Sequence, residues 1–209
     1  MGRKVIITCA LVGSATRKNQ NPNTPYSPKE LAEAAHLAYK AGAAMVHVHA
    51  IEDDGTNSTR VERIKEGRAA IKEKTPELEV YSTAGIDNYY FLAPSGNFTD
   101  PVNFNFVWGV CGGAAFRPAT FVGMASSLPP GANFSTCGVG NEEWPAITQA
   151  ILCGGHVRVG LEDNVRMPNG ELAKGNYELV ENAVRIIEAL GCEPATPDEA
   201  RNIFGIKKK

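Results

Sequence analysis

Residues 27–50, which begin with Ser27-Pro28-Lys29-Glu30 and end with Val46-His47-Val48-His49-Ala50, decide the fold. An N-cap serine, a proline in the first turn and a glutamate three residues on predict a helix start, and Gly42 predicts its end. The apolar-rich segment 44–50 that follows at once has the composition of a buried strand. A helix joined to such a strand by a short turn is typical of a parallel sheet covered by helices.

The same alternation continues in both directions from this stretch. Short apolar runs predict strands, and helical patterns lie between them. The last helix has Thr196 as N-cap, Pro197 in its first turn and Glu199 completing a capping box. We expect further strands at 5–12, 78–83, 105–110, 133–139 and 156–163, and helices at 58–74, 118–128, 142–153 and 177–191.

This alternation predicts an α/β fold, with a TIM-type (β/α) barrel as the first choice and an open doubly wound sheet as the second. No G-x-G-x-x-G pattern follows the first strand, which weakens a dinucleotide-binding interpretation. About six strand–helix units are recognisable in 209 residues, whereas a full barrel usually needs about 250. We therefore expect one domain over residues 1–209, built as an incomplete barrel.

The composition excludes several classes of function. Apolar residues make up 43% of the chain and charged residues 21%, as in soluble globular proteins. The net charge of −2 gives no nucleic-acid footprint, and no apolar run approaches the roughly 20 residues of a membrane span. The five cysteines include no C-x-x-C pair, which favours a reduced, cytoplasmic protein.

His47 and His49 form the most informative short pattern. Because side chains alternate along a strand, both imidazoles lie on one face and the flanking valines on the other. Two imidazoles at the carboxyl end of a barrel strand can hold one divalent metal ion, and barrel sites are built at that end. The alternative is a pair of hydrogen-bonded core histidines.

A second pattern is His156-Val157-Arg158-Val159-Gly160-Leu161-Glu162-Asp163-Asn164. Alternation places Arg158, Gly160 and Glu162 on one face, and buried charges there need partners. A metal ion would satisfy Glu162, while Asp163 or an anionic substrate would satisfy Arg158. Two histidines and one carboxylate are a common catalytic zinc set, and Asp163 is placed to act as a base. The glycine leaves room for a ligand or another backbone, and the alternative is a structural Arg–Glu pair.

Weaker signals lie at the ends of other expected strands. Glu79 is a candidate catalytic residue, with a surface or structural role as the alternative. Gly138 and Gly140 precede a helix whose N-terminus can accept a phosphate. With Ser82 and Asn105 they are candidates for binding substrate.

Several segments resemble one known family. They are residues 4–13, 21–22, 27–30, 41–50, 104–110, 154–164 and 196–201, and together they span most of the chain. These segments are similar to the β-keto acid cleavage enzymes.

The resemblance implies a (β/α)8 barrel in which His47, His49 and Glu162 hold zinc. It implies that a β-keto acid and acetyl-CoA give acetoacetate and a new acyl-CoA, as in 3-keto-5-aminohexanoate cleavage during lysine degradation, a branch of amino-acid catabolism. Zinc would polarise the keto acid, and Asp163, supported by Arg158, would remove a proton so that the enolate attacks the thioester. It also implies a homo-oligomer whose partners are small molecules. With acetyl-CoA as a substrate, the turn at Gly138 and Gly140 is a candidate contact for CoA.

Two departures from the family are visible. A glutamate that members carry after the first strand is absent from Gly13-Ser14-Ala15-Thr16, so the substrate can differ. The helix ending near Lys74 runs directly into Pro76–Tyr81, which resembles the family's fifth strand. We therefore expect strands three and four of the family barrel to be missing. A metal-dependent barrel hydrolase or aldolase and an inactive, truncated relative are the alternatives.

Overall fold

The computed structural model describes residues 2–58, 60–75, 79–80, 101–110 and 113–206, and of residues 79–80 it describes the backbone. Six strands form one parallel sheet in the order β4-β3-β2-β7-β6-β5. These strands are β2 (Ile7–Val12), β3 (Met45–Val48), β4 (Glu79–Val80), β5 (Asn103–Trp108), β6 (Asn133–Gly138) and β7 (His156–Val159).

The strand order is that of consecutive strands around a (β/α) barrel. Strands β2, β3 and β4 are neighbours in sequence and in space, as are β5, β6 and β7, and β7 returns to pair with β2. Strands β4 and β5 lie at the two ends of this order. The predicted α/β class with a parallel sheet is confirmed.

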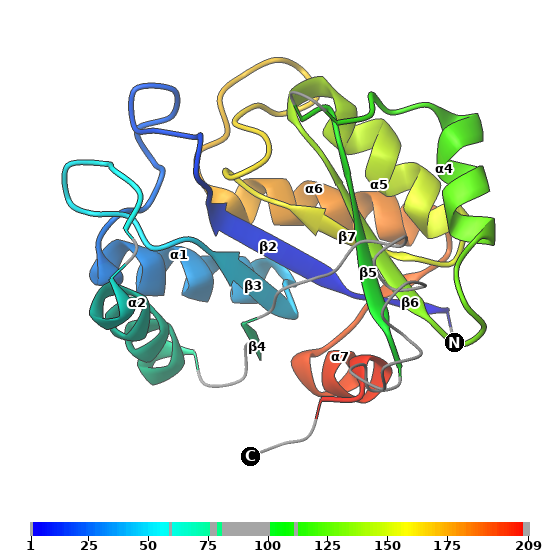
Figure 1. Ribbon diagram of the computed structural model, residues 1–209, viewed down its shortest axis with the longest axis horizontal. Coiled ribbons are helices and arrows are strands. Elements are labelled where there is room, and N and C mark those ends of the chain that lie inside the picture. The colour runs from blue at the N-terminus through cyan, green and yellow to red at the C-terminus, as the bar shows by residue number, and fades with distance from the viewer. Residues whose placement is uncertain (1, 59, 76–78, 81–100, 111–112, 207–209) are drawn as a thin grey trace.

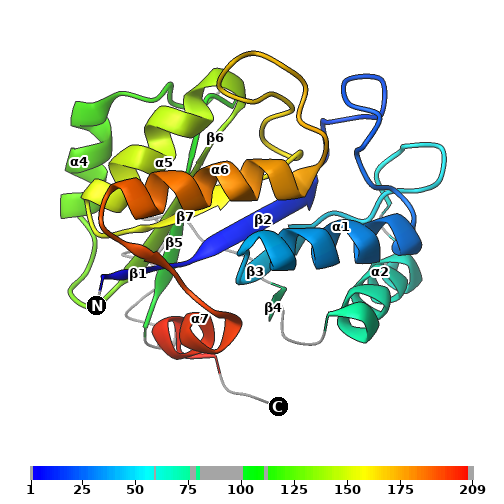
Figure 2. The same ribbon diagram turned by 180° about the vertical axis from the view of Figure 1, so that it is seen from behind.

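Helices cover one face of this sheet. Figure 1 shows helices behind the strands, and Figure 2 shows α1, α5 and α6 running across that covered face. Helix α2 packs against α1, and α7 lies below the amino ends of the strands. The helices are α1 (Pro28–Ala41), α2 (Val61–Lys74), α4 (Pro118–Ser126), α5 (Glu143–Leu152), α6 (Asn176–Ala189) and α7 (Pro197–Phe204). None of the helices in the described residues is both long and apolar enough to cross a membrane.

Two helix starts form as their residue types predict. Ser27 accepts a hydrogen bond from the backbone N–H of Glu30, whose carboxylate accepts one from the Ser27 N–H in return. Thr196 and Glu199 repeat this reciprocal pair at the start of α7. Each cap satisfies donors that have no partner within the helix, which typically contributes about 1 kcal/mol.

The core lies between the sheet and its helices in two main clusters. One joins β2, β3 and β7 to α1, α5 and α6. The other is aromatic and lies under α4, where Trp108 and Phe121 are 1% and 0% exposed. The Trp108 Nε1–H donates to Thr136 Oγ1 over 2.8 Å, so the buried indole keeps a partner. This tryptophan therefore serves packing, as a buried aromatic with a satisfied N–H usually does.

The structure moves the bounds of several predicted strands, among them 44–50, which is β3 (Met45–Val48), and 105–110, which is β5 (Asn103–Trp108), and it adds two short strands. We expected a strand over 156–163, but β7 ends at Val159 and residues 160–163 form a turn. A Cβ on Gly160 would lie 2.1 Å from the carbonyl oxygen of Ala10, so here the glycine admits another backbone. Strands β1 (Lys4–Val5) and β8 (Glu193–Pro194) pair in a second sheet that the sequence did not predict.

Candidate metal centre

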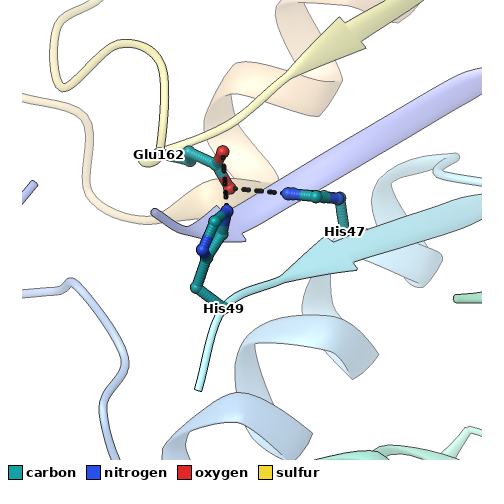
Figure 3. Close-up of side chains that lie close together, drawn as sticks. All are labelled: His47, His49 and Glu162. Carbon is teal, nitrogen blue, oxygen red and sulfur yellow. Dashed lines mark ion pairs between the residues drawn. The ribbon is translucent and has the colours of Figure 1, made fainter. Parts of the chain in front are cut away.

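Three of the predicted side chains converge above the carboxyl ends of the strands. Glu162 Oε2 lies 3.3 Å from His47 Nε2, and Glu162 Oε1 lies 3.4 Å from His49 Nε2. One ligand atom from each residue lies within 4.8 Å of the other two. Figure 3 shows both imidazoles pointing at the carboxylate, His47 from β3 and His49 from the loop directly after it. The predicted proximity of these three residues is thus present in the structure.

The sheet order explains why distant segments meet here. His47 lies on β3 and His49 just beyond its end, and β2 separates β3 from β7, which carries the turn with Glu162. Within that turn the Glu162 N–H donates to the Ala10 carbonyl over 3.1 Å. Thr16 Oγ1 donates to the Glu162 carbonyl over 2.9 Å. The backbone N–H of Glu162 is therefore bonded to β2, and its backbone carbonyl is bonded to the loop after β2.

The Arg158 guanidinium bonds both Asp163 and the candidate ligand Glu162. Its Nε and Nη2 donate to the two carboxylate oxygens of Asp163, each over 2.8 Å, and Nη2 also donates to Glu162 Oε1 over 2.6 Å. Burial alone would lower the pKa of Arg158, but the two carboxylates, Asp163 foremost, hold it above its ordinary value. The guanidinium therefore stays charged and matches the planar carboxylate with two parallel bonds.

The carboxylates respond differently to this environment. Burial would raise the pKa of Glu162, but its contacts with His47 and His49 and the charge of Arg158 hold that pKa well below the ordinary range. Burial raises the pKa of Asp163, although Arg158 opposes the rise. Contact with Glu162 raises the pKa of His49. The site therefore holds an ionised glutamate beside an aspartate that accepts a proton more readily than usual.

The residues present fit a divalent metal ion. Two carboxylates face one guanidinium, and the buried Glu162 Oε2 has the His47 imidazole 3.3 Å away but no partner in hydrogen-bond geometry among the described residues. A buried carboxylate oxygen in that state is costly unless a cation satisfies it. Two imidazole nitrogens and one carboxylate also form a common catalytic zinc set that leaves a position for substrate.

A cavity of about 820 Å³ opens above these side chains. One wall carries ionisable groups, among them the three candidate ligands, Arg158 and Asp163. Val107, Val110 and Val139 form an apolar part of its lining and are 42%, 47% and 37% exposed. The cavity thus joins a charged wall to apolar surface, a combination typical of small-molecule sites.

The remaining predicted residues lie at different depths. Gly140 lines the cavity, and its N–H donates to the Asp163 carbonyl over 2.9 Å. Gly138 instead packs against the next turn, because a Cβ there would lie 2.4 Å from backbone atoms of Glu142. Asn105 does not line this cavity and accepts a hydrogen bond from Ser135. The backbone of Glu79 pairs with Met45, and Ser82 lies outside the described residues.

Some residues at the site had no sequence signal that we recognised. Thr16, Glu143 and Asn164 are all buried next to the turn that carries Glu162. Asn164 directly follows the Glu162-Asp163 pair, so its position alone could have marked it. Glu143 begins a helix, where an acidic residue is usually explained by the helix dipole.

Fold and site together define the class of protein: a parallel α/β protein with a His-His-Glu constellation at the carboxyl ends of its strands. The sequence model of the beta-keto acid cleavage enzyme family matches residues 4–78 and 73–206. The chain therefore belongs to the β-keto acid cleavage enzyme family.

Individual relatives agree with this family. A 3-keto-5-aminohexanoate cleavage enzyme of Acetoanaerobium sticklandii is 34% identical, over 98% of this chain and 99% of its own length. A 3-dehydrocarnitine:acetyl-CoA trimethylamine transferase of Rhizobium meliloti is 26% identical, over 100% of this chain and 99% of its own length. The apo structure of ObcA superposes with a TM-score of 0.68 at 15% identity, over 88% of this chain and 66% of the ObcA chain. This chain thus spans about two thirds of that structure, which supports the fold.

Proposed function

We propose that this protein is a zinc-dependent β-keto acid cleavage enzyme that uses acetyl-CoA. A β-keto acid and acetyl-CoA would give acetoacetate and a new acyl-CoA. The observation that carries this proposal is the meeting of His47, His49 and Glu162 beside the Arg158–Asp163 pair in an open cavity. The relatives named for 3-keto-5-aminohexanoate cleavage and for transfer with acetyl-CoA support the same reaction class.

The proposed reaction exchanges one carbon–carbon bond for another. The methylene carbon between the ketone and the carboxylate loses a proton and attacks the thioester carbonyl of acetyl-CoA. The thioester C–S bond breaks and releases the CoA thiolate, which adds to the original ketone carbon. The bond between that carbon and the methylene carbon then breaks, giving the new acyl-CoA, and the released enolate takes back the proton to become acetoacetate. A zinc ion held by His47, His49 and Glu162 would supply Lewis-acid polarisation of the keto acid.

Asp163 is the proposed base for the first proton. Its raised pKa suits proton acceptance, because a base works best when its pKa approaches the working pH. Arg158 bonds both oxygens of this carboxylate and so fixes its orientation. Since the same guanidinium also bonds Glu162, it would set the distance between the base and the metal ligand.

The remaining cavity residues would bind the two substrates. The Gly140 backbone starts the short helix η2 (Gly140–Glu142), which leads into α5, and this turn is the proposed contact for CoA. The three valines in the cavity lining would exclude water from the reacting carbons. Gly138, Asn105 and Ser82 stay predicted binding residues, and Glu79 stays a predicted catalytic residue.

We further propose that the sheet is the family barrel without its third and fourth strands. The two segments of the family match overlap at residues 73–78, a range that contains the end of α2 at Lys74. The alignment with the Acetoanaerobium enzyme spans 271 positions and this chain has 209 residues, so at least 62 positions have no counterpart here. Pairing of β3 with β4 would then bridge the shortened part of the ring. A cytoplasmic setting, a role in lysine degradation and a homo-oligomeric state stay predictions.

The test is product analysis with the full chain. We expect acetoacetate from acetyl-CoA and a panel of β-keto acids, with activity lost on chelation and restored by zinc. Asp163→Asn should lose turnover while its zinc content stays at that of the wild type, whereas Glu162→Gln should lose both. Turnover that persists without metal would overturn the proposal. Product formed without a CoA acceptor would identify a hydrolase or aldolase. A protein that binds zinc and folds cooperatively but shows no turnover would be an inactive relative.

A further inference from the structure

Glu143 is a buried acid that the proposed reaction does not use. It is the first residue of α5 and is 0% exposed. One carboxylate oxygen, Oε1, accepts a hydrogen bond from Asn164 Nδ2 over 3.1 Å. For the other, Oε2, which is buried, no partner among the described residues reaches hydrogen-bond geometry, although the Gly160 N–H lies near enough to the carboxylate to oppose the rise in its pKa. Since a buried, half-satisfied carboxyl group is costly, its presence needs an explanation.

Asn164 transmits this contact to the turn beyond β7. Its Nδ2 also donates to the Arg166 carbonyl over 2.8 Å, and its Oδ1 accepts from the Arg166 N–H over 3.0 Å. Its own N–H donates to the Gly160 carbonyl over 3.0 Å. Asn164 therefore ties the segment 160–166 together, through its backbone to Gly160 and through its side chain to Arg166, and Glu143 fixes that side chain from the neighbouring helix.

The segment 160–166 carries both reactive carboxylates of the candidate site. Glu162 reaches the two imidazoles from it, and Asp163 reaches Arg158. Asn176 Oδ1 accepts the Leu161 N–H over 2.9 Å, which holds the segment on its α6 side. The contact from α5 holds it on the other side. A shift of the segment would move the metal ligand and the proposed base together.

We propose that Glu143 is a positioning residue that fixes, through Asn164, the turn presenting Glu162 to the metal and Asp163 to the substrate. The inference rests on the proposed function for the identity of the metal and the reaction. Burial fixes the Glu143 carboxyl group in one place, and only a fixed acceptor holds the amide of Asn164 in one orientation. An exposed acid at the same helix start would not do this. Burial also raises the pKa of Glu143 well above its ordinary value.

The first measurement is amide hydrogen exchange of the segment 160–166 in the metal-free full chain. We expect Glu143→Ala to speed this exchange about tenfold or more, because the segment loses its anchor on α5. Ile147→Ala is the matched control, since Ile147 is also 0% exposed and lies one turn further along the same helix. Glu143→Gln keeps the oxygen that accepts from Asn164 and should exchange like the wild type.

The second measurement is the zinc dissociation constant, from competition with a chelator. Loss of a residue behind a metal ligand typically weakens binding about 10- to 100-fold, and we expect this for Glu143→Ala but not for Ile147→Ala or Glu143→Gln. If Glu143→Ala does not fold, Asn164→Ala removes the same bond from its other partner. Equal exchange and equal zinc affinity in Glu143→Ala and Ile147→Ala would overturn the inference. Absence of zinc binding in the wild type would instead overturn the proposed function, and the exchange result would still decide whether Glu143 orders the turn.

Discussion

Gly13 and Glu162 lie so close together that a Cβ atom on Gly13 would be 2.2 Å from Cγ of Glu162. Real Cβ atoms do not approach a neighbour this closely, so the carboxylate reaches the two histidines through space that a side chain would fill. Gly13 directly follows β2, and β2 lies between β3 and β7 in the sheet. The metal centre in this arrangement therefore requires a glycine at position 13, directly after β2.

Gly13→Ala should weaken zinc binding about 10- to 100-fold, because Glu162 must move away from the histidines. The measurement is chelator competition, with thermal melting in parallel. Gly123→Ala is the matched control: this glycine lies in α4, nothing lies within 4 Å of its added Cβ, and alanine favours the helix. Equal zinc affinity in the two variants would show that Glu162 does not need this space.

Arg158→Lys should lower turnover about tenfold or more while zinc content stays unchanged. A single ammonium group cannot bond both oxygens of Asp163 and Glu162 at once, so the base loses its fixed orientation. The measurement is kcat with the best keto acid of the panel. Arg63→Lys is the control, since Arg63 is similarly covered but bonds the Ile51 carbonyl and Asp53. A parallel loss of turnover in both variants would point to general destabilisation.

The sequence predicted best where local geometry decides the outcome. The capping residues at Ser27 and Thr196 marked helix starts that the structure reproduces, because those bonds join residues three apart. Alternation placed His47 and His49 on one face, and both imidazoles do point toward Glu162. Such features need no knowledge of distant contacts.

Prediction was poorer where distant backbones meet. Alternation placed Glu162 on a strand, but it lies in a turn because Gly160 packs against Ala10, a residue far away in sequence. Glu162 still lies next to His47 and His49 as predicted, but it reaches them from a turn and not from a strand. Glu143 shows the same limit, since only the packing of α5 against the turn makes it buried.

Zinc should stabilise the folded chain, because the ligand set exists only when β3 and the turn after β7 meet. At a free concentration of 100 times Kd, the free energy of unfolding should rise by about 2.7 kcal/mol. Melting with and without chelator measures this rise. Glu162→Gln should melt at the same temperature with or without zinc. A rise in that variant equal to the wild type would place the metal elsewhere.

The buried side chain of His156 should make the free energy of unfolding depend on pH. Its Nδ1 accepts the Ile6 N–H over 3.1 Å, and its ring contacts Phe204. Burial, helped by the charge of Arg3, lowers its pKa from 6.5 to about 4. Between these two values the unfolded chain binds more protons than the folded one, so stability falls as pH decreases. The expected loss from pH 7 to pH 4 is of the order of 3 kcal/mol.

Urea unfolding at pH 7, 5.5 and 4 measures this dependence, with His156→Asn as the comparison. Asparagine keeps an acceptor for the Ile6 N–H but does not titrate in this range. The variant should be less stable at pH 7, because it loses the ring contact, yet its stability should fall less on acidification. The difference between the two proteins should therefore shrink as pH falls through 6.5 towards 4. Parallel curves would mean that His156 is not the group whose burial excludes the proton, since every other titrating group is common to both proteins.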